Sequence, residues 1–242
     1  MFKLKQIKKI PTNNQAGFTI IESLMAIIVI SILMVGIAPV LALSVANRVQ
    51  ARRVELGAIA AKSYLDGVRT GSVGPPPINT TTVTLDTIPA PGSSLPTCDN
   101  TKENIVRTPT NIADDPRDIY YCNTTTGATF YLYCVNGTPN DNECTNDNFK
   151  DMIVQVFGYN PATTDSDKGY LLGIRVYRAD AFVADKTLQT AGADDAKVAS
   201  ANTSGTGLRD NVAPLVEMTT EVTAGDTDLA DLCKLKGGSS CN

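Results

Sequence analysis

The chain has 242 residues, of which 43% are hydrophobic, and its formal net charge at pH 7 is −4. An acidic chain does not favour nonspecific nucleic-acid binding, so no nucleic-acid partner is expected. Histidine is absent, which removes the commonest side chain for proton transfer and metal ligation. The composition therefore favours one folded domain with a membrane segment, and argues against an enzyme, a cofactor or a metal site.

The first element is a basic leader, residues 1–17, with four lysines and no acidic residue. The apolar stretch after it, residues 18–46, holds one charged side chain, Glu22. In an ordinary secretory signal the apolar stretch precedes the cleavage site and leaves with the leader. Here the order is reversed, so a cut after Gly17 would remove the leader and keep the apolar segment.

This junction resembles that of type IV prepilins, with matching positions at Gly17, Phe18, Thr19, Glu22 and Pro39. In that family a prepilin peptidase cuts after the glycine and methylates the new terminal residue. The resemblance therefore implies cleavage between Gly17 and Phe18 and N-methylation of Phe18. Pro39 stands where many pilins have a helix-bending proline.

Glu22 has two interpretations. It is either a carboxylate solvated by headgroups at the membrane boundary, or the partner of an amino-terminal ammonium, since Phe18 and Glu22 share one helix face. The resemblance implies that this amine belongs to a neighbouring subunit, so that the pair sets the register of a growing filament. A paired buried charge costs far less than an unpaired one, and the whole junction favours pairing.

The apolar stretch is long enough to span a bilayer once, because about 20 apolar residues cross the hydrocarbon core. The leader lysines favour a cytoplasmic amino terminus, whereas Arg48, Arg52 and Arg53 follow the stretch closely and oppose that orientation. Six cysteines in the downstream region indicate an oxidising compartment. We therefore expect a single-pass plasma-membrane protein with a cytoplasmic amino terminus and a periplasmic or extracellular carboxyl-terminal domain.

Helical periodicity continues beyond the membrane segment and predicts one helix over residues 18–68. Its apolar stripe follows the spacing i, i+4, i+7, i+11 and i+14. The members of this stripe are Val54, Ala58, Ala61, Leu65 and Val68. We expect the stripe to pack against the protein's own folded domain.

A segment rich in proline and glycine, residues 71–97, follows the helix and predicts an irregular surface connector. Runs rich in β-branched and aromatic residues then predict strands. These runs are residues 119–122, 128–134, 152–157 and 171–177, with residues 212–222 as an edge strand. Antiparallel strands packed on the upper helix make an α+β fold, with the tyrosines packing the sheet.

The cysteines predict disulfides, because none has zinc-knuckle spacing and no histidine is present. They are Cys98, Cys122, Cys134, Cys144, Cys233 and Cys241. Their spacing alone leaves many connectivities open. Many pilins close a small loop at the carboxyl end, and this likeness implies Cys233–Cys241. We then expect Cys98–Cys122 and Cys134–Cys144 as the remaining pairs.

Two acidic segments are candidate calcium sites, and the first of them begins like a calcium loop. One is residues 165–169, and the other is the cluster Asp141, Glu143, Asp147 and Asp151. The first lacks the later carboxylates of a calcium loop. We expect both to be solvated turns without a metal.

The resulting domain organisation has five parts. These are a prepilin leader (1–17), a transmembrane and assembly half-helix (18–46), an amphipathic half-helix (47–70), the connector (71–97) and an exported disulfide-containing β-sheet domain (98–242). The resemblance implies a minor pilin or pseudopilin of a type IV pilus-like filament. Its implied partners are other pilin subunits, prepilin peptidase, an inner-membrane assembly platform and the lipid bilayer.

The subtype is indicated by three further segments. Residues 52–56, 60–69 and 173–180 look like cyanobacterial pseudopilins of hormogonium polysaccharide secretion, which implies a role in polysaccharide export and gliding motility. The alternatives are a minor pilin for adhesion or DNA uptake and a type II secretion pseudopilin. From another class, a membrane-anchored exported binding domain or enzyme that never polymerises also remains open.

Overall fold

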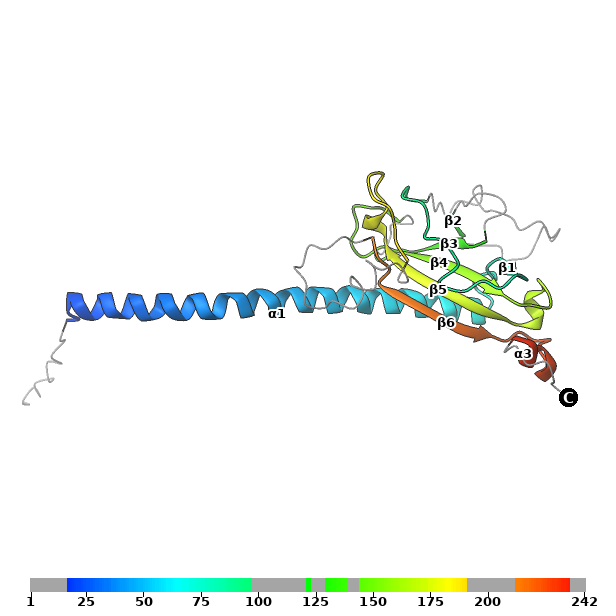
Figure 1. Ribbon diagram of the computed structural model, residues 1–242, viewed down its shortest axis with the longest axis horizontal. Coiled ribbons are helices and arrows are strands. Elements are labelled where there is room, and N and C mark those ends of the chain that lie inside the picture. Colours follow the sequence, from blue (N-terminus) through cyan, green and yellow to red (C-terminus); the bar gives the residue numbers. More distant parts are fainter. Residues whose placement is uncertain (1–16, 97–120, 123–128, 139–143, 191–211, 236–242) are drawn as a thin grey trace, which may run out of the picture. The chain divides into compact units, whose positions relative to one another are not determined.

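The computed structural model describes residues 17–96, 121–122, 129–138, 144–190 and 212–235 (Figure 1). The chain divides into two compact units, Met1–Val45 and Ala46–Asn242. One long helix, α1 (Ile20–Arg69), begins in the first unit and continues into the second. It lies within two residues of the helix that the sequence predicts, because Thr19 caps its start and Gly71, with φ 73°, lies just beyond its end.

The second unit contains one six-stranded sheet and short helices (Figure 1). Its strands are β1 (Ile78–Asn79), β2 (Tyr121–Cys122), β3 (Tyr131–Val135), β4 (Met152–Tyr159), β5 (Tyr170–Arg178) and β6 (Val216–Val222). Its short helices are η1 (Ser166–Lys168), η2 (Ala179–Ala181) and α3 (Leu229–Leu235). The strands from β2 to β6 are antiparallel and lie in chain order. This is the pilin-like α+β architecture expected from the sequence, with β6 ending the row of strands as predicted.

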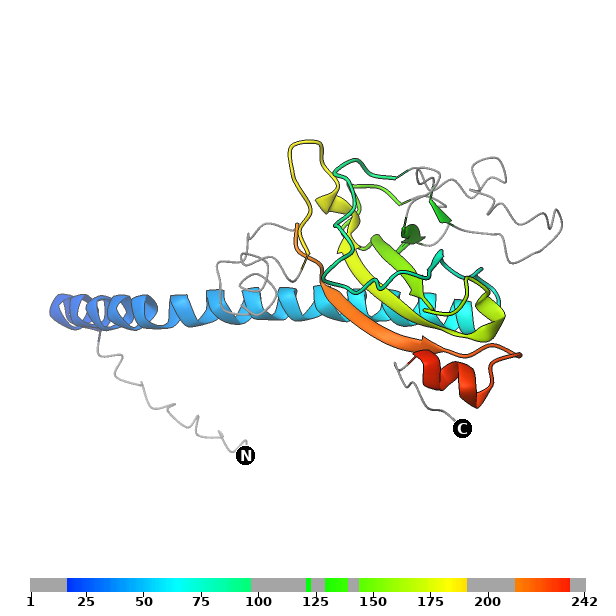
Figure 2. The ribbon, with the colours of Figure 1, turned by 45° about the vertical axis from the view of Figure 1, so that its right-hand side comes forward.

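Both faces of the sheet are covered, which explains why the two central strands are buried along nearly their whole length. On one face, Met152, Val154 and Val156 join a core with the part of α1 that belongs to the second unit. On the other face, Ile153 and Tyr177 join a second core beneath the loops. Figure 2 shows the sheet lying along this part of α1, with the loops on the opposite side.

The buried face of α1 is rotated from the predicted stripe. The helix buries Gly57, Ala60, Ala61, Tyr64 and Leu65, whereas Val54 keeps 40% of its surface exposed. The prediction was therefore wrong for Val54 and missed Gly57, Ala60 and Tyr64. At Gly57 the helix approaches the entry to β6 so closely that an added Cβ would lie 3.0 Å from the Leu215 Cβ. Periodicity of apolar residues could not reveal this contact, because it depends on the absence of a side chain.

The connector also differs from the irregular surface segment that its prolines predict. Its β1 pairs in parallel with β4, and the Gly158 amide donates to the Pro77 carbonyl at 2.8 Å. Its Ile88 is 2% exposed, and its Ala90 and Leu95 pack against the second core. The connector thus adds a strand and helps to close the second core.

The disulfide Cys134–Cys144 confirms one of the predicted pairings, with a Cα–Cα distance of 5.9 Å. It joins the end of β3 to the loop before β4. Cys122 and Cys233 are also disulfide-bonded. Their predicted partners, Cys98 and Cys241, lie outside the described residues.

In the two acidic segments considered as calcium sites, Asp165 and Asp151 organise turns. Asp165 caps η1 by accepting from the Asp167 amide at 3.0 Å. Asp151 is fully buried and accepts from the amides of Gly137 at 3.0 Å and Thr145 at 2.9 Å. The part of the chain that the structure describes holds no group of three or more His, Cys, Asp or Glu side chains suited to a metal. Asp141 and Glu143 lie outside it.

Candidate functional site

The predicted processing junction lies immediately before α1. Gly17, Phe18 and Thr19 are not helical, and the Thr19 hydroxyl accepts from the Glu22 amide at 3.3 Å. This side-chain cap marks the helix start because it satisfies one of the first free N–H groups. The Gly17–Phe18 bond therefore lies in irregular chain, and Phe18 is 83% exposed. An irregular, exposed peptide bond is one that a peptidase can reach.

Glu22 lies in the first turn of α1, where its negative charge suits the positive end of the helix dipole. Its side chain is exposed and makes no ion pair with any residue in the described ranges. Phe18 precedes it by four positions, although the helix itself begins only at Ile20. A carboxylate at the start of an apolar helix is thus left available for a cation from another molecule.

The first unit presents apolar side chains on every side of the helix, since all its described residues are exposed. The exposed large apolar side chains of this unit include Phe18, Ile21, Leu33, Leu41 and Val45. The helix is long and apolar enough to cross a membrane, with a mean hydropathy of 2.8 in its most apolar window. Soluble proteins rarely expose apolar patches of this extent, so this surface requires lipid or other apolar helices around it.

Pro39 lies inside α1 and interrupts its hydrogen-bond ladder. Proline has no N–H, so the carbonyl of Val35 receives no bond from that position. The neighbouring Gly36 adds backbone freedom, and nothing lies within 4 Å of where its Cβ would be. The helix is therefore weakened locally in its apolar half.

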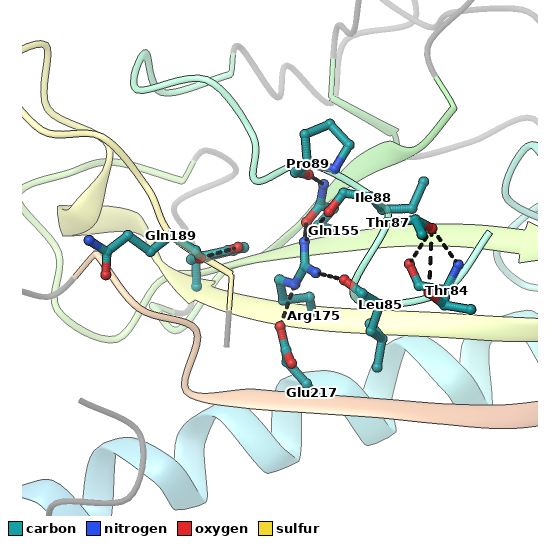
Figure 3. Close-up of polar contacts among 10 residues, drawn as sticks. Thr84, Leu85, Thr87, Ile88, Pro89, Gln155, Arg175, Gln189 and Glu217 are labelled. Carbon is teal, nitrogen blue, oxygen red and sulfur yellow. Dashed lines mark hydrogen bonds and ion pairs between the residues drawn. The ribbon is translucent and has the colours of Figure 1, made fainter. Parts of the chain in front are cut away.

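The second unit contains a buried polar cluster centred on Arg175 of β5, which is 1% exposed (Figure 3). Its Nε donates to Glu217 Oε1 of β6 at 2.5 Å, and its Nη1 donates to Gln155 Oε1 of β4 at 2.8 Å. The guanidinium also donates to the carbonyls of Leu85 and Ile88 in the connector. We call these five residues the Arg175 cluster.

The Arg175 cluster binds the connector to three strands. Gln155 extends it by donating to the Pro89 carbonyl at 2.8 Å. The guanidinium is occupied by protein acceptors, so the cluster offers no open position for a substrate and is structural. The prediction from sequence missed it, although a lone arginine within the apolar run of β5 was a signal that could have been followed.

A group of tyrosines joins α1 to the sheet. Tyr121 donates to the Gly74 carbonyl at 2.7 Å, so Tyr64, whose hydroxyl oxygen lies 2.6 Å away, donates to Tyr121. Ring centroids of Tyr64 and Tyr133 lie 5.2 Å apart, and those of Tyr121 and Tyr131 lie 4.9 Å apart. Burial raises the pKa of Tyr121 well above its ordinary value, so the phenol stays protonated. As predicted, these sheet tyrosines pack the core.

A sequence profile described as the prokaryotic N-terminal methylation motif, a type IV pilin signature, matches residues 12–38. The matched residues include Gly17, Phe18 and Glu22 and end one position before Pro39. No curated protein and no solved structure matches the chain significantly. The motif implies processing by a prepilin peptidase and assembly with other pilins, and the long apolar helix indicates membrane anchoring. This N-terminal segment is therefore the candidate functional site.

Proposed function

We propose that this chain, which carries the type IV pilin signature, is the precursor of a structural subunit of a type IV pilus-like filament, either a minor pilin or a pseudopilin. The observation that carries the proposal is the methylation motif at residues 12–38, continuous with the part of α1 in the first unit, whose residues are all exposed. Such a helix needs apolar neighbours. A bilayer supplies them before assembly, and other subunits supply them afterwards.

Processing removes the leader and creates the new amino terminus that takes part in assembly. Cleavage after Gly17 exposes an amine on Phe18, which the peptidase then methylates. The four leader lysines leave with the leader. The new ammonium and the Glu22 carboxylate then lie at the same end of the helix, and each remains available to a neighbouring subunit.

Assembly depends on pairing between the Glu22 carboxylate of one subunit and the Phe18 ammonium of the next. Both charges would enter an apolar surrounding formed by packed helices. An unpaired charge there is strongly unfavourable, whereas a pair is tolerated. The pairing therefore selects one stagger between neighbouring helices, and Pro39 lets the helix adjust within the packed filament.

The exported side is the one that carries the sheet. The disulfide Cys134–Cys144 and the bonded Cys122 and Cys233 suit an oxidising compartment. The leader then lies in the cytoplasm, where the peptidase acts. The proposal assigns no catalytic reaction to the chain itself, because the peptidase and the assembly machinery are separate proteins.

Processing provides the test of this proposal. Full-length protein co-expressed with a prepilin peptidase should begin at a methylated Phe18 when its amino terminus is examined by mass spectrometry. Gly17→Val should block the cut and leave Met1 in place. No atom lies within 4 Å of a Cβ at Gly17, so this variant does not disturb packing. Wild-type protein that keeps residues 1–17 in the presence of active peptidase would refute the proposal.

The proposed subtype is a pseudopilin of polysaccharide secretion and gliding motility. It rests on the likeness of residues 52–56, 60–69 and 173–180 to cyanobacterial pseudopilins of that system. Deletion of the gene in its own organism should remove most of both the secreted polysaccharide and the gliding, because the filament would lack this subunit. Wild-type protein should restore both. Loss of adhesion, DNA uptake or protein secretion alone would contradict this subtype and leave the filament proposal standing.

A further inference from the structure

The first turns of α1 within the second unit form a basic band on an otherwise acidic unit. We call Arg48, Arg52 and Arg53 the basic collar. No acidic residue lies among residues 46–53, whereas the chain after Arg53 holds 24 acidic and 14 basic residues. Charge is therefore segregated to the end of the unit that adjoins the apolar span.

The collar is accessible and largely unneutralised. Arg48 and Arg52 are exposed and Arg53 is half-buried. Arg48 has no ion pair within the ranges that the structure describes. Arg52 pairs with Glu55 at 2.7 Å, but the two side chains are 65% and 55% exposed, and a pair of this kind contributes little and exchanges readily.

Arg53 experiences a further positive charge from the sheet. Burial, and after it the charge of Arg178 at the end of β5, lowers the pKa of Arg53, whereas the charge of Asp180 opposes this shift. Arg178 is itself 9% exposed and bonded to Asp180. Its Nε, also buried, has no partner among the described residues.

Spacing along α1 places the collar at the depth of lipid phosphates. Arg48 lies 26 positions after Glu22, so the helix between them rises about 39 Å, and about 45 Å to Arg52. A bilayer including its headgroups is about 40–45 Å thick. With Glu22 in one headgroup layer, the collar reaches the opposite one. Guanidinium groups bind phosphate oxygens in a two-pronged geometry.

We propose that the basic collar binds the phosphate groups of anionic phospholipids in the leaflet on the side of the sheet. The bond holds the unassembled subunit in the bilayer and must break when the subunit enters a filament. The proposal requires membrane anchoring by α1 and does not depend on filament assembly. The lipid is favoured over carboxylates of a second copy because the collar directly follows the apolar span and meets the headgroups first.

Native mass spectrometry of the full chain in neutral detergent micelles tests the collar, with phosphatidylglycerol and phosphatidylcholine as the added lipids. Wild-type protein should retain phosphatidylglycerol in preference to phosphatidylcholine. Replacing Arg48, Arg52 and Arg53 together with glutamine should weaken phosphatidylglycerol binding about fivefold per arginine, or on the order of a hundredfold in all. Binding of phosphatidylcholine should stay unchanged.

A charge-matched control variant is K62Q/R69Q/K150Q, which removes three exposed cations elsewhere. It should bind phosphatidylglycerol like wild type.

The double variant R48Q/R52Q spares half-buried Arg53, so it tests the collar even if the triple variant misfolds. Its phosphatidylglycerol binding should weaken about twenty-fivefold. Equal retention of both lipids by wild type, full retention by R48Q/R52Q, or equal loss in the control would each overturn the proposal. Cross-linked dimers that require the collar, without loss of lipid binding, would assign it to a second copy instead. The processing test at Gly17 is unaffected by any of these results.

Discussion

Replacing Glu22 with alanine should abolish filament assembly and leave processing intact. The Phe18 ammonium of the next subunit would then enter the packed helices without a carboxylate. An unpaired charge in such a surrounding costs about 3 kcal/mol, which corresponds to roughly a hundredfold loss in each subunit-addition equilibrium. The measurement is the amount of sheared filament recovered per cell, compared with total processed protein.

Two further variants separate charge from shape. Glu22→Gln keeps the size of the side chain and loses its charge, so it should fail like the alanine variant. Ser23→Ala removes only a hydroxyl that donates to the Ile20 carbonyl at 2.9 Å, and it should assemble normally. Wild-type filament yields from Glu22→Ala would show that no essential pair exists. If the leader of Glu22→Ala is not cleaved, Glu22 would instead be a residue that the peptidase recognises.

Replacing Arg175 with methionine should lower the free energy of unfolding of the second unit by about 3–5 kcal/mol, the cost of removing one partner from a buried pair. Glu217 would lose its bond to the guanidinium, and the connector carbonyls would lose their donor. Unfolding of the full chain in micelles by denaturant, with disulfides kept oxidised, measures this change. Tyrosine fluorescence can report it, because the chain has eight tyrosines and no tryptophan.

The matched control is Arg69→Met at the exposed end of α1, which should change the free energy of unfolding by no more than about 0.5 kcal/mol. Arg175→Lys keeps the positive charge but loses the planar guanidinium. Its free energy of unfolding should therefore lie between those of Arg175→Met and Arg69→Met. If Arg175→Met and Arg69→Met unfold at the same denaturant concentration, the connector is held by its apolar contacts alone.

The prepilin-like pattern at the amino terminus could be predicted from the sequence. The order of basic leader, Gly17, apolar stretch and Glu22 is a linear pattern, so it needs no knowledge of distant contacts. The match to the methylation motif at residues 12–38 confirms that pattern. The exact peptide bond cut and the role of Glu22 in pairing stay predictions, since they concern other proteins that act on this one.

The sheet was predictable to a lesser degree. β3, β4, β5 and β6 follow from runs of β-branched and aromatic residues, because such runs suit a pleated, buried surface. β1 was missed because its two residues pair only with β4, far away in the chain, and lie beside a run of prolines. A strand of that length has no periodicity of its own to detect.

The side chains on α1 show why its buried face was misplaced. Val54 fits an apolar stripe but is exposed, whereas Gly57 and Tyr64 interrupt the pattern and are buried. At Gly57 the side chain of Leu215 lies too close for an added Cβ. Tyr64 is buried with its hydroxyl bonded to the hydroxyl of Tyr121 on β2. Hydrophobicity alone records neither close approach nor hydrogen bonding.

By itself, the sequence determined the prepilin-like pattern at the amino terminus, the membrane-length helix and the α+β class. Each of these depends on local order, composition or short separation along the chain. Only the tertiary structure decided which face of α1 is buried, how the connector closes the second core, and why Arg175 lies inside an apolar strand. Those features depend on residues up to 90 positions apart, such as Arg175 and Leu85. Their contacts exist only once the sheet has formed, because folding brings donor and acceptor together where water cannot replace either of them.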